Sequence, residues 1–172
     1  MGLREETAEK HRIAEQKEFN QKMFRGELTK EEYIDYLKVQ LLIFQAIENN
    51  FNLPHDGLKR YDKVKEDLGE LGYNVDLLNY SLDYVNYLIT LDNETILPHI
   101  YLNYLALAYG GQMMKTKVPG SGRMYDFDNM MECVGSIRAI QKDEWVDEVN
   151  KGFDFLIEIF DELQNTIRPN GE

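Results

Sequence analysis

Apolar residues recur every three or four positions along most of the chain, which is the spacing of one face of an α-helix. The clearest stretch begins at Tyr33 and runs through Leu37 and Leu41 to Phe44. No stretch of alternating apolar and polar residues is long enough to form a sheet. The pattern therefore predicts an all-α protein, an irregular helical bundle in which residues 1–172 form a single domain.

Capping and turn residues divide this pattern into segments. Thr29 and Glu32 form a capping box, which predicts the start of a helix that continues to about residue 50. Pro119, Gly120 and Gly122 mark the clearest loop. We expect the other helices at residues 3–24, 98–114, 129–141 and 143–167, with one short helix inside 51–72, two inside 75–91, and a loop over 115–128.

Composition and charge narrow the possible functions. The 172 residues include 19 Lys and Arg against 31 Asp and Glu, a net charge of -12. Clustered basic residues bind phosphate backbones and anionic lipids, so this balance argues against nucleic acid and membrane surfaces as partners. The longest stretch free of charged side chains, residues 95–114, includes His99 and Asn103 and predicts a buried helix rather than a membrane span. With a single cysteine and no signal-peptide pattern, we expect a cytoplasmic protein.

The sequence lacks the motifs of several common catalytic sites. None of the three histidines follows a glutamate by three positions, so the Glu-x-x-His motifs of di-iron bundles are missing. One cysteine and scattered histidines do not predict a tetrahedral zinc site. No glycine-rich phosphate-binding motif occurs. Cys133 is compatible with a nucleophile, but a buried structural thiol is the commoner use of such a residue.

The first predicted helix carries a histidine among small neighbours. Leu3, Thr7, His11 and Ala14 follow at spacings of four, four and three, so they share one side of the helix. This side offers a hydroxyl, an imidazole and a methyl group where large apolar groups are expected. A neutral imidazole beside open space suits the axial ligation of haem iron. A histidine that is hydrogen-bonded to a neighbour is the commoner explanation from the pattern alone, and both stay open.

Two adjacent glycines interrupt the apolar helix expected at residues 98–114. Glycine costs about 1 kcal/mol relative to alanine inside a helix, so Gly110 and Gly111 together cost about 2 kcal/mol unless the helix ends there. One explanation is the close approach of a flat ligand to the backbone. Another is an ordinary helix C-terminus, where glycine is favoured. Met113 and Lys115 fit a continuing helix, which weakens the second explanation.

These two features occur together in one known family. Residues 3–15 have the order Leu, Thr, His and Ala-Glu and resemble the first helix of heme oxygenases; the resemblance continues to the break at residues 26–29. Residues 99–112 resemble the distal helix of that family, with its Gly-Gly-Gln ending. Phe153 and residues 160–163 are similar to the last helix. The likeness spans nearly the whole chain in the same order, and its first motif is the most specific.

The resemblance implies a ligand and a reaction. Haem would be both cofactor and substrate, held between the first helix and the distal helix, with His11 as the proximal iron ligand and O2 on the side of Gly110. The ring would be opened to biliverdin with release of ferrous iron and carbon monoxide, and an external donor, ferredoxin or a similar reductant protein, would supply electrons. The resemblance implies a catalytic segment at the end of the distal helix, called the distal run below, that contains Tyr109, Gly110, Gly111 and Gln112. The residues that it implies around the haem are Arg4, Thr7, His11, Ala14, Glu15, Tyr101, Ala106, Gly110, Arg138 and Phe153. Of these, Arg4, Tyr101 and Arg138 would lie near the propionates.

The distal run departs from the family pattern in three places. Ala106 replaces the first glycine of the family, Leu107 its aspartate and Tyr109 its serine. The family aspartate organises water for proton delivery, and a leucine side chain cannot hydrogen-bond water. Tyr109, Gln112 or Asn103 would have to order that water instead. A haem-binding or sequestering protein of the same fold without turnover is therefore the main competing function.

Two further classes of protein explain less of the sequence. One class is a different enzyme of this fold, such as a thiaminase-like hydrolase or a di-iron oxidase. The absence of Glu-x-x-His motifs and the position of Cys133 in a late helix argue against both enzymes. A helical interaction module leaves the pairing of His11 with Gly110 and Gly111 unexplained.

The charge balance also predicts where the basic residues lie. Propionates and ferredoxins are both acidic, so the few basic residues are expected to gather at the haem edge. We expect Arg4 and Arg138 beside the haem, with acidic residues on the opposite side of the molecule. The same argument predicts a local basic rim, formed either by Lys10, Arg12, Lys17 and Lys22 or by Lys115, Lys117 and Arg123.

Overall fold

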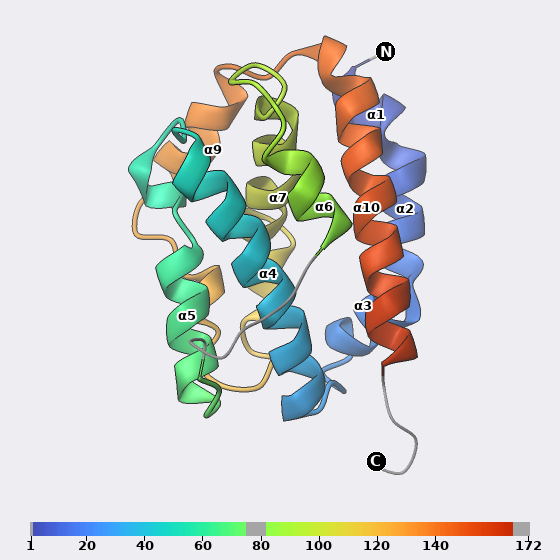
Figure 1. The fold of residues 1–172 in the computed structure, drawn as a ribbon, viewed down its shortest axis with the longest axis vertical. Coiled ribbons are helices and arrows are strands. Elements are labelled where there is room, and N and C mark those ends of the chain that lie inside the picture. Colours follow the sequence, from blue (N-terminus) through green and yellow to red (C-terminus); the bar gives the residue numbers. More distant parts are fainter. Residues whose placement is uncertain (1, 75–81, 167–172) are drawn as a thin grey trace.

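A computed structural model describes residues 2–74 and 82–166 of the chain. Throughout these ranges the protein is helical and contains no β-strand, which confirms the all-α prediction (Figure 1). The helices are α1 (Leu3–Glu6), α2 (Ala8–Gln16), α3 (Glu18–Phe24), α4 (Lys30–Asn50), α5 (Tyr61–Glu70), α6 (Asp83–Leu88), α7 (Leu97–Ala108), α8 (Gly111–Met114), α9 (Met130–Arg138) and α10 (Val146–Asn165). Short 3-10 turns occupy Asp56–Leu58, Arg123–Tyr125 and Asp143–Trp145.

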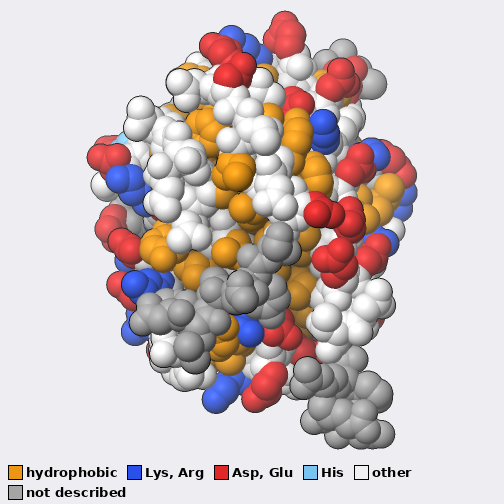
Figure 2. All heavy atoms as spheres, in the orientation of Figure 1, with side chains coloured by type: hydrophobic (Ala, Val, Ile, Leu, Met, Phe, Trp, Pro, Cys, Tyr) orange, Lys and Arg blue, Asp and Glu red, His pale blue; other side chains and the backbone are white. Residues whose placement is uncertain are grey.

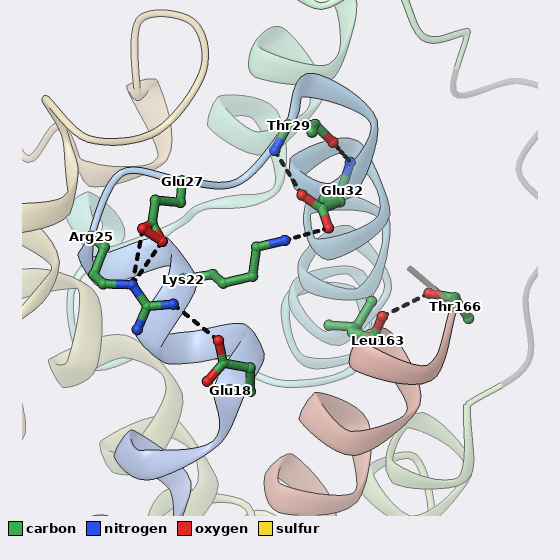
Figure 3. A network of polar contacts seen from close by, with 8 residues as sticks. All are labelled: Glu18, Lys22, Arg25, Glu27, Thr29, Glu32, Leu163 and Thr166. Carbon is green, nitrogen blue, oxygen red and sulfur yellow. Dashed lines mark hydrogen bonds and ion pairs between the residues drawn. The ribbon is translucent and has the colours of Figure 1, made fainter. Parts of the chain in front are cut away.

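Helix α4 begins where the capping box predicts. The Thr29 hydroxyl accepts a hydrogen bond from the backbone N–H of Glu32 at 3.1 Å, and the Glu32 carboxylate accepts one from the backbone N–H of Thr29 at 2.8 Å (Figure 3). Lys22 of α3 forms an ion pair with the same carboxylate at 2.9 Å. Loss of such a cap costs about 1 kcal/mol, so these contacts stabilise the turn that joins α3 to α4.

The helix expected over residues 3–24 is divided into α1, α2 and α3, so the prediction of one continuous helix was wrong. At the first break the Thr7 hydroxyl donates a hydrogen bond to the Leu3 carbonyl at 2.9 Å, a side-chain bond that competes with regular helix geometry. At the second break Lys17 is extended, with ψ of 138°. Side-chain amides of Asn20 and Gln21 bond there to carbonyls of α2, which lowers the cost of ending that helix.

The remaining expected elements agree with the structure in type and differ in extent. Helix α5 is the short helix expected inside 51–72, and α6 is one of the two expected inside 75–91. Residues 75–81 of that segment, and residue 167 at the end of the last expected helix, lie outside the described residues. Helices α9 and α10 match the two closing predictions, and the predicted loop at 115–128 holds only a 3-10 turn. No described helix is long and apolar enough to cross a membrane.

Helix α10 is the common support of the two sequence motifs. It packs against α2, α3 and α7, whereas α5 packs on α4 at the opposite edge of the molecule (Figure 1). A large apolar cluster surrounds α4. A smaller cluster joins α1 and α2 to α7 and α10 through Leu3, Ala14, Leu102, Trp145, Val149 and Phe153. The motif at His11 and the motif at Gly110 are therefore carried by helices that rest on the same α10.

The loop between α8 and α9 is held by two buried charges. The Arg60 guanidinium, which is 2% exposed, donates to the backbone carbonyls of Met124 at 3.0 Å and Asp126 at 2.6 Å. The buried Asp67 carboxylate accepts the backbone N–H groups of Arg123 and Met124, both at 2.9 Å. Burial raises the pKa of Asp67, which these backbone bonds oppose. These contacts fix the segment that lies directly behind α8.

Candidate active site

His11 projects from α2 at the protein surface. Its side chain is 60% exposed, and its ring centroid lies 5.6 Å from that of Phe153 on α10. Nδ1 lies 3.4 Å from a carboxylate oxygen of Glu15, whereas Nε2 makes no hydrogen bond to any residue in 2–74 or 82–166. A core histidine is thereby excluded. A carboxylate at one ring nitrogen with the other nitrogen open is the arrangement of imidazoles that bind metals.

The small neighbours of His11 are buried beneath it. Thr7 is 4% exposed and Ala14 is 5% exposed, and Ala14 belongs to the cluster shared with α10. The imidazole is thus the exposed group on a side of α2 that is otherwise packed. Small side chains at these two positions let α2 and α10 approach closely, which places Phe153 beside the His11 ring.

The distal helix breaks at Tyr109, so the continuous helix expected over 98–114 was also wrong. Helix α7 ends at Ala108, Tyr109 has φ of -99° and ψ of -85°, and α8 starts at Gly111. Gly110 has φ of -61° and ψ of -29°, which any residue adopts. The closest atom to a Cβ added there would be the Ala106 carbonyl oxygen at 3.9 Å. Neither the backbone conformation nor packing within the protein therefore requires glycine at position 110. The remaining explanation for glycine is that a side chain here would project into the open space outside the chain.

Gly111 has a different explanation from its neighbour. It is buried, and a Cβ at this position would lie 2.8 Å from the ring of Tyr125, whose own side chain is in the core. Packing against the loop behind α8 therefore requires glycine here. The adjacent glycines serve two purposes: Gly111 seats α8 on Tyr125, and Gly110 keeps the outer face of the break clear.

Three residues were candidates to order distal water in place of Leu107, which is itself buried in the large core cluster. The side-chain amide of Gln112 donates to the backbone carbonyls of Leu107 at 3.3 Å and Tyr125 at 2.6 Å, so it ties α7 to the loop. The amide of Asn103 is buried and donates to the Tyr84 hydroxyl and the His99 carbonyl. Tyr109 is 54% exposed, and its hydroxyl makes no hydrogen bond to a described residue.

The predicted propionate partners lie in different surroundings. Arg4 is exposed on α1, and Tyr101 is half-buried on α7 with its ring edge-on to Trp145. Arg138 is exposed at the end of α9, where its guanidinium lies 5.5 Å from the ring centre of Tyr109. Neither arginine forms an ion pair with a carboxylate in the described part of the chain. The structure thus brings Arg138 to the distal break.

The expected basic rim is not formed as predicted. Of the seven residues in the two alternative sets, six are in ion pairs with carboxylates of this chain, namely Lys10–Asp154, Arg12–Glu9, Lys17–Asp161, Lys22–Glu32, Lys115–Asp126 and Arg123–Glu70. Two of these carboxylates, Asp154 and Asp161, belong to α10, along which α2 and α3 lie, and Figure 2 shows acidic side chains over α10. The other four lie on α2, α4, α5 and the loop between α8 and α9, close to the basic residue that each one pairs with. Positive charge on these helices is therefore compensated locally instead of forming a free rim.

A buried polar network that joins α6, α7 and α10 was not foreseen from the sequence. His99 of α7 is 0% exposed, with Nε2 2.7 Å from the Glu148 carboxylate and Nδ1 2.8 Å from the Tyr84 hydroxyl. Burial lowers the pKa of His99, although Glu148 opposes that shift. Burial would raise the pKa of Glu148, but hydrogen bonds from His99 and Tyr87 outweigh it and lower the pKa. The sequence signal was two polar residues, His99 and Asn103, one turn apart within an apolar helix.

Two hollows in the surface lie away from the predicted site. One is bounded by Pro98, Trp145 and Glu148, and the other by Tyr84, Phe155 and Glu158. The lining of neither includes His11 or Gly110. The assignment of the site therefore rests on the exposed imidazole and the open glycine face, not on these hollows.

Solved structures share this arrangement of helices. Heme oxygenase-1 from the cyanobacterium Synechocystis in complex with heme superposes with a TM-score of 0.80 at 22% identity, covering 95% of this chain and 90% of that one. Heme oxygenase from Leptospira interrogans gives 0.80 at 22% identity, with 94% and 100% covered. Heme oxygenase-2 from Synechocystis in complex with heme and NO gives 0.80 at 23% identity, with 95% and 84% covered.

The family itself follows from the sequence match. No curated protein matches the chain significantly. A family model described as heme oxygenase matches residues 1–162, which include His11, Gly110 and Phe153. Because this match covers most of the chain, the protein belongs to the heme oxygenase family.

Proposed function

We propose that the protein carries out the reaction of its family: it binds haem and, with O2 and external electrons, opens the ring to biliverdin, ferrous iron and carbon monoxide. The observation that carries the proposal is a family match spanning both the exposed imidazole of His11 and the open face at Gly110. Both features face outward, and neither is accounted for by packing within the protein.

The residues present fit haem on the α2 side. The Nε2 atom of His11 is the proposed iron ligand, and Glu15 beside Nδ1 would keep the proton on that nitrogen and strengthen the ligand. Phe153 offers an aromatic ring next to the imidazole. The small, buried Thr7 and Ala14 keep α2 close to α10 without projecting toward the ligand.

The α7 side supplies space and charge. Exposed Ala106 and Gly110 are four residues apart, so they lie on one side of the broken helix and carry no bulk toward a flat ring. Arg4, Tyr101 and Arg138 are the proposed partners of the two propionates, because both arginines lack an ion pair among the described residues. A cation without its own carboxylate is the group best able to bind an external one.

When bound, haem supplies the iron that activates O2 and the ring carbon that is oxidised. The task left to this chain is to hold water and a proton at the distal side without the family aspartate. We assign that task to the hydroxyl of Tyr109, because Gln112 and Asn103 use their amide donors on other groups. Gly111 and Gln112 support the break from behind rather than act on the ligand.

The electron donor and the cellular location of the protein are also part of the proposal. Ferredoxin or a similar small reductant protein is the proposed electron source. A cytoplasmic location is supported by the single cysteine, Cys133, which is free and buried.

A second function is favoured by one observation. Leu107 stands where the family aspartate lies and is packed into the core, so no carboxylate is available at that position to organise water. A protein that binds or sequesters haem without turnover would need His11 and Gly110 but not a proton relay. The two functions share the same ligand and differ in product.

One experiment separates them. Hemin is added to the purified protein and the Soret band is recorded, after which ferredoxin, its reductase and NADPH are supplied. The proposed enzyme gives a shifted Soret band that decays as biliverdin and free iron appear. A stable haem complex without biliverdin supports the binding-only function, and absence of a Soret shift contradicts both. His11→Ala is expected to change the haem spectrum; an identical spectrum would refute the ligand assignment.

A further inference from the structure

The methionines in the described part of the chain differ sharply in exposure. Met23, Met114 and Met124 are buried, whereas Met113 is 62% exposed and Met131 is 82% exposed. Neither exposed methionine belongs to the core clusters or to the side chains packed against them. A thioether sulfur takes up one oxygen atom to become a sulfoxide, and exposure makes the sulfur accessible to an oxidant.

Met113 lies on the outer side of the distal break, next to Gly110. Gly110 and the residues of α8 are right-handed helical, and the backbone N–H of Met113 donates to the Gly110 carbonyl at 3.3 Å. Residues three apart in a helix are neighbours on the same side, and both of these residues are exposed. The thioether therefore borders the open face of Gly110, which is where O2 would bind in the proposed function.

The other exposed residues of this stretch do not accept an oxygen atom in this way. Ala106 and Gly110 carry at most a methyl group, and the side-chain amide of Gln112 is already fully oxidised at carbon. The phenol of Tyr109 reacts by losing an electron and a proton rather than by gaining oxygen. Among the exposed side chains from residue 106 to residue 113, the sulfur of Met113 is therefore the preferred oxygen acceptor.

Met131 presents the same side chain away from the break. It lies near the start of α9, seven residues before Arg138, and the Arg138 guanidinium is the group of this helix that lies over the ring of Tyr109. Seven helical residues span about 10 Å along the axis, so Met131 is at the far end of α9 from this contact. Because Met131 is more exposed than Met113, an oxidant dissolved in water should attack it at least as readily.

We propose that Met113 is a modification site, whose sulfur takes one oxygen atom from O2 activated at the haem site in turnovers that do not oxidise the ring. The step consumes one O2, two electrons from the external donor and two protons. The O–O bond breaks, one oxygen atom forms the S–O bond of methionine sulfoxide, and the other leaves as water. The sulfur supplies two of the four electrons that O2 takes up, and the donor supplies the other two. This inference rests on the proposed function.

The test supplies the protein with hemin, ferredoxin, its reductase and NADPH under heavy-isotope-labelled O2. Catalase is added to remove peroxide that escapes into solution. Peptide mapping by mass spectrometry, with fragment ions that distinguish Met113 from Met114, then locates the labelled oxygen. We expect the label at Met113 to exceed that at Met131 by about fivefold or more. Hydrogen peroxide added without hemin or donor should instead oxidise Met131 at least as much as Met113, because access to solvent then decides.

Met113→Leu, which keeps an apolar side chain of similar size, is the variant that checks the assignment. It should remove the label from this peptide without raising the label at Met131. Equal labelling of Met113 and Met131 in the unaltered protein, or biliverdin formation with Met113 unlabelled, would overturn this inference alone. Labelled Met113 without biliverdin would refute the proposed reaction but support this inference. Absence of haem binding would refute both.

Discussion

At His11 the strength of the proposed ligand depends on the carboxylate behind it. Glu15 Oε1 lies 3.4 Å from Nδ1, and both groups are exposed to solvent. A carboxylate at this nitrogen favours the tautomer that carries the proton on Nδ1 and leaves Nε2 free to bind a metal. The identity of both residues was predicted from the motif, whereas the exposure of the imidazole could be decided only by how α2 rests on α10.

Glu15→Gln is expected to weaken haem binding by about tenfold, because an amide keeps the side-chain size but removes the negative charge. Resonance Raman spectra of the ferrous complex should show a lower iron–histidine stretching frequency. Glu9→Gln on the same helix is the control, since the Glu9 carboxylate pairs with Arg12. An unchanged frequency and affinity in Glu15→Gln would show that the carboxylate does not act on the imidazole.

The buried His99 makes stability depend on pH. Burial lowers its pKa, so the native state keeps the ring neutral where an unfolded chain, with a pKa near 6.5, has taken up a proton. The stability from this group is complete above about pH 6.5 and is lost as the pH falls toward the native pKa. The lowered pKa of Glu148 adds a second loss below about pH 4.5.

We expect the thermal unfolding midpoint of the unaltered protein to fall between about pH 7.5 and pH 5.5. His99→Gln should unfold at a lower temperature at pH 7.5, because the bonds to Glu148 and Tyr84 are disturbed. The difference between the two proteins should shrink as the pH falls. A constant difference across this range would mean that the protonation of His99 contributes nothing to the slope.

At the scale of elements, the interruption of the distal helix is the feature that sequence predicted least well. Two glycines inside an apolar helix fit either a ligand contact or a helix end. The structure shows that each glycine has its own cause, since Gly111 meets Tyr125 and Gly110 faces open space. Tyr125 comes from a distant loop fixed by Arg60 and Asp67, a contact that no local pattern contains.

Replacing Gly110 and Gly111 by alanine, one at a time, should have different effects on the stability of the protein. Gly111→Ala should destabilise the protein by about 1–3 kcal/mol, because its Cβ would lie 2.8 Å from the Tyr125 ring. Gly110→Ala should leave stability unchanged or raise it by up to about 1 kcal/mol, because the backbone is already helical and the space is open. Chemical denaturation measures both changes.

The variant that is expected to keep its stability, Gly110→Ala, is the one expected to lose activity. Gly110→Ala is expected to slow biliverdin formation and alter the haem spectrum while the protein stays folded, since its methyl group projects toward the proposed ligand. If Gly110→Ala formed biliverdin at the original rate, the open face would not be the distal side. Comparable destabilisation of the two variants would instead contradict the separate causes assigned to the glycines.

For the whole molecule, the all-α architecture and the order of helices followed from periodicity, capping and turn residues. Thr29 and Glu32 form the expected box, and α4, α9 and α10 lie where the pattern placed them. The breaks at Thr7 and Lys17 were missed because a break of one residue leaves the spacing of apolar positions nearly intact. The distribution of charge was also missed, because it depends on which helices lie side by side.

That distribution has a consequence for electron transfer. The net charge is -12, and the basic residues of α2 and α3 are neutralised by carboxylates, two of which, Asp154 and Asp161, lie on α10. An acidic ferredoxin that approaches α2 and α3 therefore meets basic residues that are already paired with carboxylates of this chain. Long-range attraction between the two proteins is expected to be weak, and repulsion between net negative charges works against encounter at low salt.

The rate of haem reduction by an acidic ferredoxin should thus stay level or rise when salt is increased from about 20 to 200 mM, because screening removes the repulsion. A steep fall over this range would contradict the local pairing of charges and indicate a functional basic surface. Asp154→Asn and Asp161→Asn free Lys10 and Lys17 from their partners. If pairing is what suppresses attraction, the double variant should be reduced faster at low salt and should lose that gain as salt is added.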